Sequence, residues 1–372
     1  MRNFLNRPQF AVDALYRAVA AGDFDGERRN LTWSRRRHAL LLTSQPNGKS
    51  RAGAKKVRGT YTSKPTRAEF QFHEVLPSWN LRLDESTQGY RIYLRVADES
   101  VRWSPWFYFG SGGTSAQHPP EHPTTRSSRW GIVHIDYLEL SRAATWFQYR
   151  VELESAPHAS GLPVQQPVLE RFFISVSNTS GDAGLYAARN AETNGFRAAR
   201  AQAIRVPYRS QLDVSVPRLR EKICCPTCVA MMLERAGIDK STLDVAAEAY
   251  DAEHKIYGVW PRAAQTAANN GCEAWVQRFR THAQVKQMLL EGQPIMASIR
   301  VGKGELNRAL YSASGGHLML LRGFRRNGDY IVNDPYSAGP KGGAIDYTEE
   351  DIGKVWLDKG GVGIIIRNPK EQ

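Results

Sequence analysis

The sequence predicts two domains, an all-β sandwich or jelly roll followed by an α+β domain. The chain of 372 residues is long for one domain, since typical domains hold about 100 to 150 residues. Residues 58–182 repeatedly alternate apolar with polar side chains, as half-buried strands do. In residues 204–370, helical patterns precede apolar strands, which is the segregated order of an α+β domain.

The first 57 residues are predicted to form a basic, solvated N-terminal arm. Residues 1–60 contain 13 Lys and Arg against four Asp and Glu, and the whole chain carries a net charge of +13. Such an arm could contact phosphates or an anionic surface. No nucleic-acid-binding module with stacking aromatics accompanies it, so we predict no specific nucleic-acid partner.

No run of apolar residues approaches the roughly 18 to 20 needed to cross a bilayer, so no transmembrane segment is predicted. The N-terminus also lacks the uninterrupted apolar core of an export signal. The cellular compartment stays open. Free thiols and the missing signal favour the cytoplasm, whereas aromatic residues in the β domain favour the cell envelope or exterior.

Four segments of the β domain show the alternation of a strand with one buried face. They are residues 91–96, 133–137, 147–153 and 172–176. Stretches that contain Gly and Pro separate them and supply the turns, and two packed sheets would bury the apolar faces. A β-sandwich is therefore the predicted architecture.

Aromatic residues crowd this domain at Ser78–Asn80, Trp103–Trp106 and Phe107–Phe109. Exposed rings on a sandwich can hold sugars, so a carbohydrate or cell-wall ligand is one alternative, but large rings more often fill the core. His118 and His122 could ligate a metal, although their Pro-rich loop does not favour it.

Residues 183–203 are rich in Ala and Arg, show no strand alternation, and are predicted to be a linker. The second domain then opens with an extended segment that ends at Gln211. Three helices and three strands are predicted after it. The helices are Leu243–Ala249, Ala263–Asn269 and His282–Leu290, and the strands are Pro294–Val301, His317–Phe324 and Tyr330–Asn333.

The stretch Glu221–Gly237 places three cysteines at the start of a further helix. Pro226 fits its first turn and Gly237 its end. Backbone N–H groups and the helix dipole favour a thiolate there, so Cys224 is a candidate nucleophile. Taken alone, the stretch fits small buried cysteines at least as well. Reduced thiols are predicted, since Cys272 could pair with only one of the three.

Downstream residues supply the groups that a thiolate needs. His317 opens an apolar strand, and Asp334 follows the next strand. An imidazole can take the thiol proton and later give it to the leaving amine, and a carboxylate fixes the tautomer and orientation of that imidazole. The Gln211 amide and a backbone N–H at the helix start can stabilise the oxyanion. The order Gln211, Cys224, His317, Asp334 therefore indicates a thiol hydrolase.

The C-terminal domain resembles the papain-like cysteine peptidases related to the bacteriocin-processing, double-glycine peptidases. The resemblance covers residues 204–368. Its motifs are Val206–Tyr208 leading to Gln211, Cys224–Thr227, Tyr257–Pro261, Gly316–Leu318 and Asn333–Pro335. The family has Cys-Gly-Pro-Thr or Cys-Gly-Pro-Ala at the second motif, so Cys225 departs from its pattern.

This resemblance implies a papain-like α+β fold and cleavage of a peptide or protein substrate without a cofactor. It implies that Cys224 is the nucleophile, His317 the base, Asp334 the residue that orients the base, and Gln211 the oxyanion donor. The β domain is similar to the N-terminal region that accompanies such peptidase domains in some bacterial proteins. That similarity lies in Ser78–Asn80, Trp103–Trp106 and Asp136–Leu138.

Three other functions remain as alternatives. A dithiol oxidoreductase would use Cys225 and Cys228, which have C-x-x-C spacing, but no predicted strand feeds their helix directly. A zinc site would need all three cysteines and His317, yet the adjacent Cys224 and Cys225 project in different directions. A non-catalytic papain-like module that only binds a ligand is the third alternative.

The turn after His317–Phe324 decides whether His317 and Asp334 can meet. A two-residue turn at Asn327-Gly328 would leave them four positions apart, which is too far. A turn at Arg325-Arg326 would pair them directly, and a four-residue loop would set Asp334 opposite Met319, diagonal to His317. We predict one of these two registers, with the side chains roughly 2.6 to 3.2 Å apart.

Overall fold

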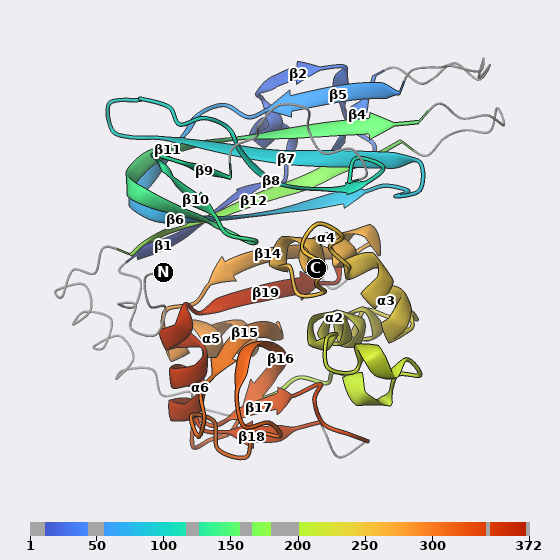
Figure 1. Cartoon of the computed structure of the whole chain (residues 1–372), viewed down its shortest axis with the longest axis vertical. Coiled ribbons are helices and arrows are strands. Elements are labelled where there is room, and N and C mark those ends of the chain that lie inside the picture. Colours follow the sequence, from blue (N-terminus) through green and yellow to red (C-terminus); the bar gives the residue numbers. More distant parts are fainter. Residues whose placement is uncertain are drawn as a thin grey trace. The chain divides into compact units, whose positions relative to one another are not determined.

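The structure, a computed structural model, describes residues 12–43, 56–116, 126–156, 166–179, 201–339 and 343–369. The chain forms two compact units (Figure 1). The N-terminal unit is Leu15–Val176, and the C-terminal unit contains Ser177–Gln372. Nearly all of the predicted linker lies outside the described residues, as do His118 and His122.

The N-terminal unit is built from strands that pair mostly antiparallel, and its long strands are buried over most of their length. Its described part forms a 12-stranded hydrogen-bonded system with the central order β2-β5-β11-β6-β12-β4-β3. The strands are β1 (Val12–Ala18), β2 (Glu27–Arg29), β3 (Leu31–Ser34), β4 (Ala39–Leu42), β5 (Val57–Thr62), β6 (Thr66–Arg82), β7 (Gln88–Ala97), β8 (Phe107–Gly113), β9 (Ser127–Ser128), β10 (Gly131–Val133), β11 (Leu138–Ser155) and β12 (Val168–Asn178), with a 3-10 helix at Ala21–Phe24.

Strand β11 joins the parts of this unit. Its first half pairs with β6, where Leu138 faces Val75. Its second half pairs with β7 and β5, so that Val151 lies between Ile92 and Tyr61, and all three side chains are buried. The unit is therefore all-β, as predicted, while its division into the two sheets of a sandwich stays a prediction.

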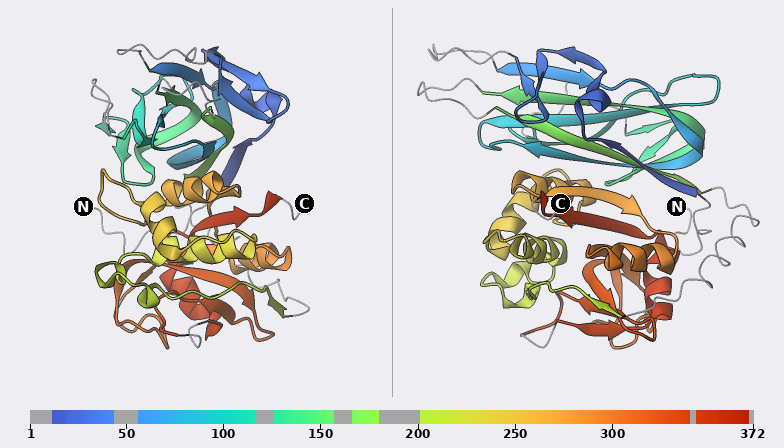
Figure 2. Two further views of the ribbon diagram at one scale, coloured as in Figure 1. Left: turned by 90° about the vertical axis from the view of Figure 1, so that its right-hand side faces the viewer. Right: turned by 180° about the vertical axis from the view of Figure 1, so that it is seen from behind.

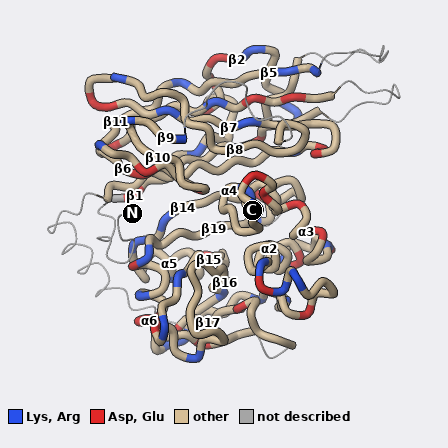
Figure 3. Tube along the Cα trace, in the orientation of Figure 1, with Lys and Arg blue, Asp and Glu red and all other residues tan. Residues whose placement is uncertain are grey.

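The basic arm predicted for residues 1–57 is wrong over residues 12–43, where the chain forms β1 to β4. Strand β4 pairs with β12 and with β3, and Leu31 and Leu40 are buried. Burial of these apolar side chains holds the segment in the sheet in spite of its charge. Arg35–Arg37 lie in the exposed turn between β3 and β4, and Figure 3 shows basic and acidic residues in both units.

One predicted strand is shorter than expected. The sequence alternation spans residues 133–137, but β10 ends at Val133 and the chain turns, with the His134 N–H bonded to the Tyr137 carbonyl at 2.9 Å. Ile135 is 37% exposed in this turn, because apolar side chains in a turn need not share a buried face. The other three predicted segments lie within β7, β11 and β12.

The C-terminal unit combines helices with an antiparallel sheet of order β14-β19-β15-β16-β17-β18, in which β13 also pairs with β16. The strands are β13 (Gln202–Ala203), β14 (Glu273–Arg278), β15 (Ile295–Val301), β16 (Ser314–Phe324), β17 (Tyr330–Asn333), β18 (Ile345–Tyr347) and β19 (Val362–Arg367). The helices are α2 (Cys224–Arg235), α3 (Thr242–Ala249), α4 (Trp260–Asn269), α5 (His282–Leu290) and α6 (Glu349–Val355), with 3-10 turns at Gln211–Asp213, Pro217–Leu219 and Leu357–Lys359.

The predicted helices and strands of this unit all occur, as α3, α4, α5, β15, β16 and β17. The α+β class is thereby supported. The sequence reasoning missed β14, β18, β19 and α6. Strand β19 is a short apolar run, and periodicity alone cannot tell such a run from a buried helix.

Helix α2 packs against β16 and against α3 and α4, as the views in Figures 1 and 2 agree. It ends just before Gly237, whose φ of +78° is the left-handed conformation predicted for a glycine stop. This packing fixes the start of α2 beside the strand that carries His317. In the described residues, no helix has the length and apolar character needed to span a membrane.

Candidate active site

The cysteine helix begins where the sequence predicts, with Cys224 as the first residue of α2 and Pro226 in its first turn. Thr227 anchors this turn, because its hydroxyl and its backbone N–H both donate to the Ile223 carbonyl, at 2.7 and 3.0 Å. Cys224 is half-buried. Its thiol therefore lies at a helix start, where the backbone N–H groups have no intrahelical partner.

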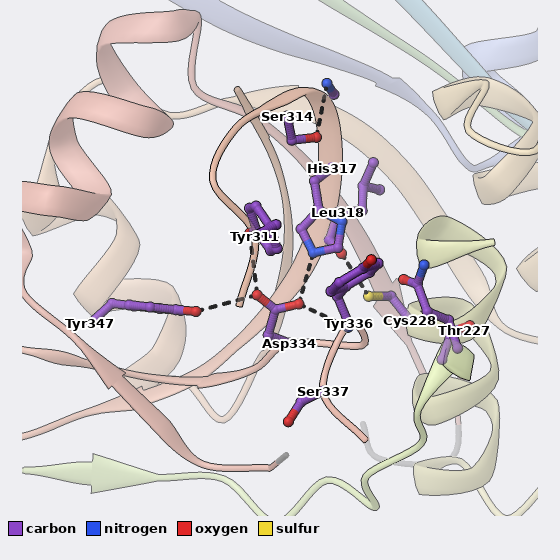
Figure 4. A network of polar contacts seen from close by, with 12 residues as sticks. Thr227, Cys228, Tyr311, Ser314, His317, Leu318, Asp334, Tyr336, Ser337 and Tyr347 are labelled. Atoms are coloured by element: carbon purple, nitrogen blue, oxygen red, sulfur yellow. Dashed lines mark hydrogen bonds and ion pairs between the residues drawn. The ribbon is translucent and has the colours of Figure 1, made fainter. Parts of the chain in front are cut away.

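Strands β16 and β17 bring the histidine and the aspartate together. Leu320 pairs with Asn333, so one further residue sets Asp334 beside Met319 and diagonal to His317. This is the second of the two predicted registers, although the chain reaches it through a longer loop and a register shift. His317 Nε2 lies 2.8 Å from Asp334 Oδ1 (Figure 4).

The electrostatics of these groups favour an ion pair between thiol and imidazole. Burial lowers the pKa of His317, but the charge and hydrogen bond of Asp334, together with Cys224, outweigh it and raise that pKa to about 10. Burial raises the pKa of the Cys224 thiol, but the hydrogen bond and charge of His317 bring the net pKa below its usual value. A thiolate beside an imidazolium is the favoured state.

Asp334 stays ionised although its side chain is fully buried. Burial pushes the pKa of its carboxyl up, but the charge and hydrogen bond of His317 hold the net pKa below the usual range. Three more donors contact the carboxylate: the Tyr336 N–H at 3.0 Å, and the hydroxyls of Tyr311 and Tyr347, each at 3.3 Å (Figure 4). Sequence reasoning missed both tyrosine side chains, and no local pattern marks either.

Gln211, the predicted oxyanion donor, is buried at the start of a 3-10 turn. Its backbone N–H donates to the Pro335 carbonyl at 2.9 Å, which ties it to the residue after Asp334. Its Nε2 donates to the Arg220 carbonyl at 2.5 Å. One of the two Nε2 protons is used in this way, and the amide retains a second.

The other cysteines lie in a different environment from Cys224. Cys225 and Cys228 are fully buried. The Cys228 Sγ lies 3.5 Å from the Leu318 carbonyl, and burial raises the pKa of this thiol well above its usual value. Among the described residues, no group of three or more His, Cys, Asp and Glu side chains could hold a metal ion.

Asn333 points away from the pair of His317 and Asp334, as expected for the neighbour of Asp334 on a strand. Its Oδ1 accepts hydrogen bonds from Arg322 Nε at 2.9 Å and from the Ala344 N–H at 3.2 Å. It therefore does not compete for His317, although it immediately precedes Asp334 in the sequence.

Both units match models of C39 peptidase domains. Residues 203–364 match the Peptidase C39 like family, and residues 15–172 match the Peptidase C39 N-terminal domain. The C-terminal unit belongs to the C39-like peptidase family. The C39-like peptidases are cysteine-type hydrolases, so the chain is a cysteine peptidase. This agrees with the resemblance found in the sequence.

Two solved structures are similar to nearly half of this chain. A double-glycine-motif protease from an AMS/PCAT transporter, solved in complex with the leader peptide, has 15% identity and a TM-score of 0.32, and the alignment covers 46% of this chain and 99% of that protein. The peptidase domain of Streptococcus ComA, a bifunctional ABC transporter involved in a quorum-sensing pathway, has 15% identity and a TM-score of 0.30, with coverage of 45% and 97%. No curated protein matches the sequence significantly.

Proposed function

We propose that Cys224, His317 and Asp334 form the catalytic triad of this C39-like peptidase, and that Gln211 is an oxyanion donor. The observation that carries the proposal is the buried contact of 2.8 Å between His317 Nε2 and Asp334 Oδ1, next to a thiol whose pKa His317 lowers. With Nε2 bound to Asp334, the Nδ1 of the ring is the nitrogen available to Cys224. We propose a peptide or protein as the substrate.

The first chemical step is attack of the Cys224 thiolate on the carbonyl carbon of the scissile bond. The S–C bond forms as the carbonyl electrons move to oxygen, which becomes an oxyanion. The backbone N–H of Cys224 at the start of α2 and the second Nε2 proton of Gln211 would donate to that oxygen. Gln211 is suited to this role because its other proton already holds the amide on the Arg220 carbonyl.

The second step breaks the C–N bond of the peptide. The His317 imidazolium gives its proton to the leaving amine, and a thioester to Cys224 remains. His317 then takes a proton from an incoming water, whose oxygen attacks the thioester and releases the carboxylic product and the thiolate. Asp334 keeps the ring oriented throughout and stabilises its charged form.

The alternatives draw less support. A dithiol mechanism would require Cys225 and Cys228 to meet a partner thiol, but both are fully buried. The tryptophans that could have held a carbohydrate ligand on the β unit are Trp79, Trp103 and Trp106. Trp79 is buried in the core. The other two rings are already covered by guanidinium groups, which lie 4.3 to 4.6 Å from the ring centres.

The proposal is tested by alkylation of the full chain with iodoacetamide, followed by mass mapping of the labelled peptides. Cys224 should react fastest near neutral pH, and Cys224→Ala should lose both that labelling and hydrolysis of dye-labelled casein. Cys228→Ala is the control: it alters a buried thiol on the same helix and should lower stability by about 1 kcal/mol while labelling of Cys224 persists. Labelling that survives Cys224→Ala and disappears in Cys225→Ala would transfer the nucleophile to Cys225.

A further inference from the structure

Asp334 is held by more hydrogen bonds than the orientation of an imidazole alone requires. Its Oδ1 accepts from His317 Nε2 at 2.8 Å and from the Tyr336 N–H at 3.0 Å. Its Oδ2 accepts from the hydroxyls of Tyr311 and Tyr347, both at 3.3 Å. The two tyrosines reach this oxygen from separate elements, the segment between β15 and β16 and strand β18 (Figure 4).

We propose that Tyr311 and Tyr347 are positioning residues of the peptidase, whose hydroxyls hold Asp334 Oδ2 and thereby keep Oδ1 on His317 Nε2. The inference rests on the triad proposed above. Rotation of an aspartate carboxylate about its last torsion is soft, so a single bond at Oδ1 would leave the group free to turn. Asp334 is fully buried, and protein donors therefore have to supply the restraint at its second oxygen.

The direction of these hydrogen bonds follows from the chemistry of the partners. An ionised carboxylate can only accept, so each phenol must donate. Burial, together with the nearby charge of Asp334, raises the pKa of both Tyr311 and Tyr347 well above the usual value. Both hydroxyls thus keep their protons over the whole working pH range and remain donors.

Tyr311 has a second contact that its hydroxyl does not provide. Its ring meets the His317 ring edge to face, with centroids 5.0 Å apart and planes at 62°. Replacement by phenylalanine keeps this ring contact and removes only the donor to Asp334. Tyr→Phe changes at both positions therefore isolate the hydrogen bonds.

The groups that face Asp334 determine how this restraint affects catalysis. They are His317 on β16, Cys228 on α2, Tyr311, Tyr347, and Tyr208, whose hydroxyl donates to the Asp334 backbone carbonyl at 3.0 Å. Donors to the charged form of a carboxyl favour ionisation, so their loss makes Asp334 easier to protonate. A protonated or misaligned Asp334 no longer stabilises the His317 imidazolium, and the Cys224 thiolate loses its partner. The rate of Cys224 alkylation falls on acidification, and this acid limb of its pH profile must then move to higher pH.

The experiment measures the rate of Cys224 alkylation by iodoacetamide against pH in the full chain. In the Tyr311→Phe, Tyr347→Phe double variant, alkylation at mildly acid pH should be about tenfold slower than in the wild type, as expected for the loss of hydrogen bonds to a charged group. Each single variant should show part of this loss, and Asp334→Asn a larger one. The single variants test the proposal if the double variant does not fold.

Tyr330→Phe is the matched control. Tyr330 is a buried tyrosine that pairs with Tyr347 across β17 and β18, but its hydroxyl bonds to His282 Nδ1 at 2.8 Å. This variant should lower the melting temperature without moving the acid limb. An equal shift in Tyr330→Phe would reduce the effect to general loss of packing and overturn the proposal.

Two results separate this inference from the triad itself. If the tyrosine variants match the wild type while Asp334→Asn moves the limb, the positioning role is wrong and the triad stands. If neither the tyrosine variants nor Asp334→Asn moves the limb, and Cys224 reacts as an ordinary thiol, the triad is wrong and the positioning role fails with it.

Discussion

At the scale of single residues, the pKa values of Cys224 and His317 are shifted so that each side chain favours its charged form. The pKa of His317 is raised to about 10, and that of Cys224 is lowered. Because the two groups interact strongly, the titration steps belong to the pair rather than to either residue. Between the two steps the thiolate and the imidazolium coexist, and both are needed for cleavage of a peptide bond.

Hydrolysis and alkylation should therefore differ at alkaline pH. A raised pKa means that the His317 imidazolium is fully present at neutral pH and is lost as pH rises through about 10. Hydrolysis of dye-labelled casein should fall there, because the leaving amine no longer receives a proton. Alkylation needs only the thiolate and should not fall.

In the Asp334→Asn variant, the alkaline limb of the pH profile of hydrolysis should move to lower pH, and kcat should drop by roughly a hundredfold or more. An unchanged alkaline limb would remove Asp334 from the proposed triad.

At the scale of elements, one buried carboxylate ties three strands of the N-terminal unit together, β11, β5 and β7. Glu154 on β11 lies 3.0 Å from Lys56 Nζ, 3.4 Å from Arg58 Nε and 3.6 Å from Arg91 on β7, and it accepts from the Thr114 hydroxyl at 2.9 Å. Burial raises the pKa of Glu154, but the hydrogen bonds of Lys56 and its neighbours outweigh it and lower the pKa to about 2. The charged form is thus stabilised by folding.

Glu154→Gln should destabilise this unit by about 3 kcal/mol, because cationic side chains around a buried site lose their partner. Since the folded pKa is depressed, the contribution of Glu154 is fully present above its unfolded pKa and is lost as pH falls toward 2. Urea unfolding at several pH values measures both effects. Glu152→Gln, a half-buried neighbour on β11, serves as the control and should cost much less. Equal losses in the two variants would show that the network contributes nothing specific.

At the scale of the whole molecule, residues 15–43 of the predicted basic arm are part of the N-terminal unit. Deletion of residues 12–43 should therefore unfold that unit, because β4 pairs with β12 and Leu40 is fully buried. Replacement of Arg35–Arg37 by glutamine changes the charge of the exposed turn only and should leave the unit folded. Circular dichroism and limited proteolysis distinguish the two outcomes. A deletion variant with unchanged thermal unfolding would contradict this placement.

Much of the C-terminal unit could be predicted from local sequence. The start of α2 at Cys224 follows from a proline in the first turn and a glycine stop, and these are properties of neighbouring residues. The strands that carry His317 and Asp334 follow from apolar runs. The requirement that the two side chains meet narrowed the register to two choices, and the structure has one of them. Turn residues alone favoured a third register, with a two-residue turn at Asn327-Gly328, and that register is wrong.

The sequence by itself indicated two units in this order and their all-β and α+β classes, and it supplied the four polar residues that are proposed as the site. It did not determine that residues 12–43 belong to the sheet. The charged residues of this segment were given more weight than its short apolar runs, because the strand that pairs with β4, β12, lies far along the chain. Nor did it indicate Tyr311 and Tyr347, which come from a loop and a short strand. Only the tertiary structure decided these points, because contacts between distant segments depend on how β16, β17 and β18 pack and not on the pattern within any one of them.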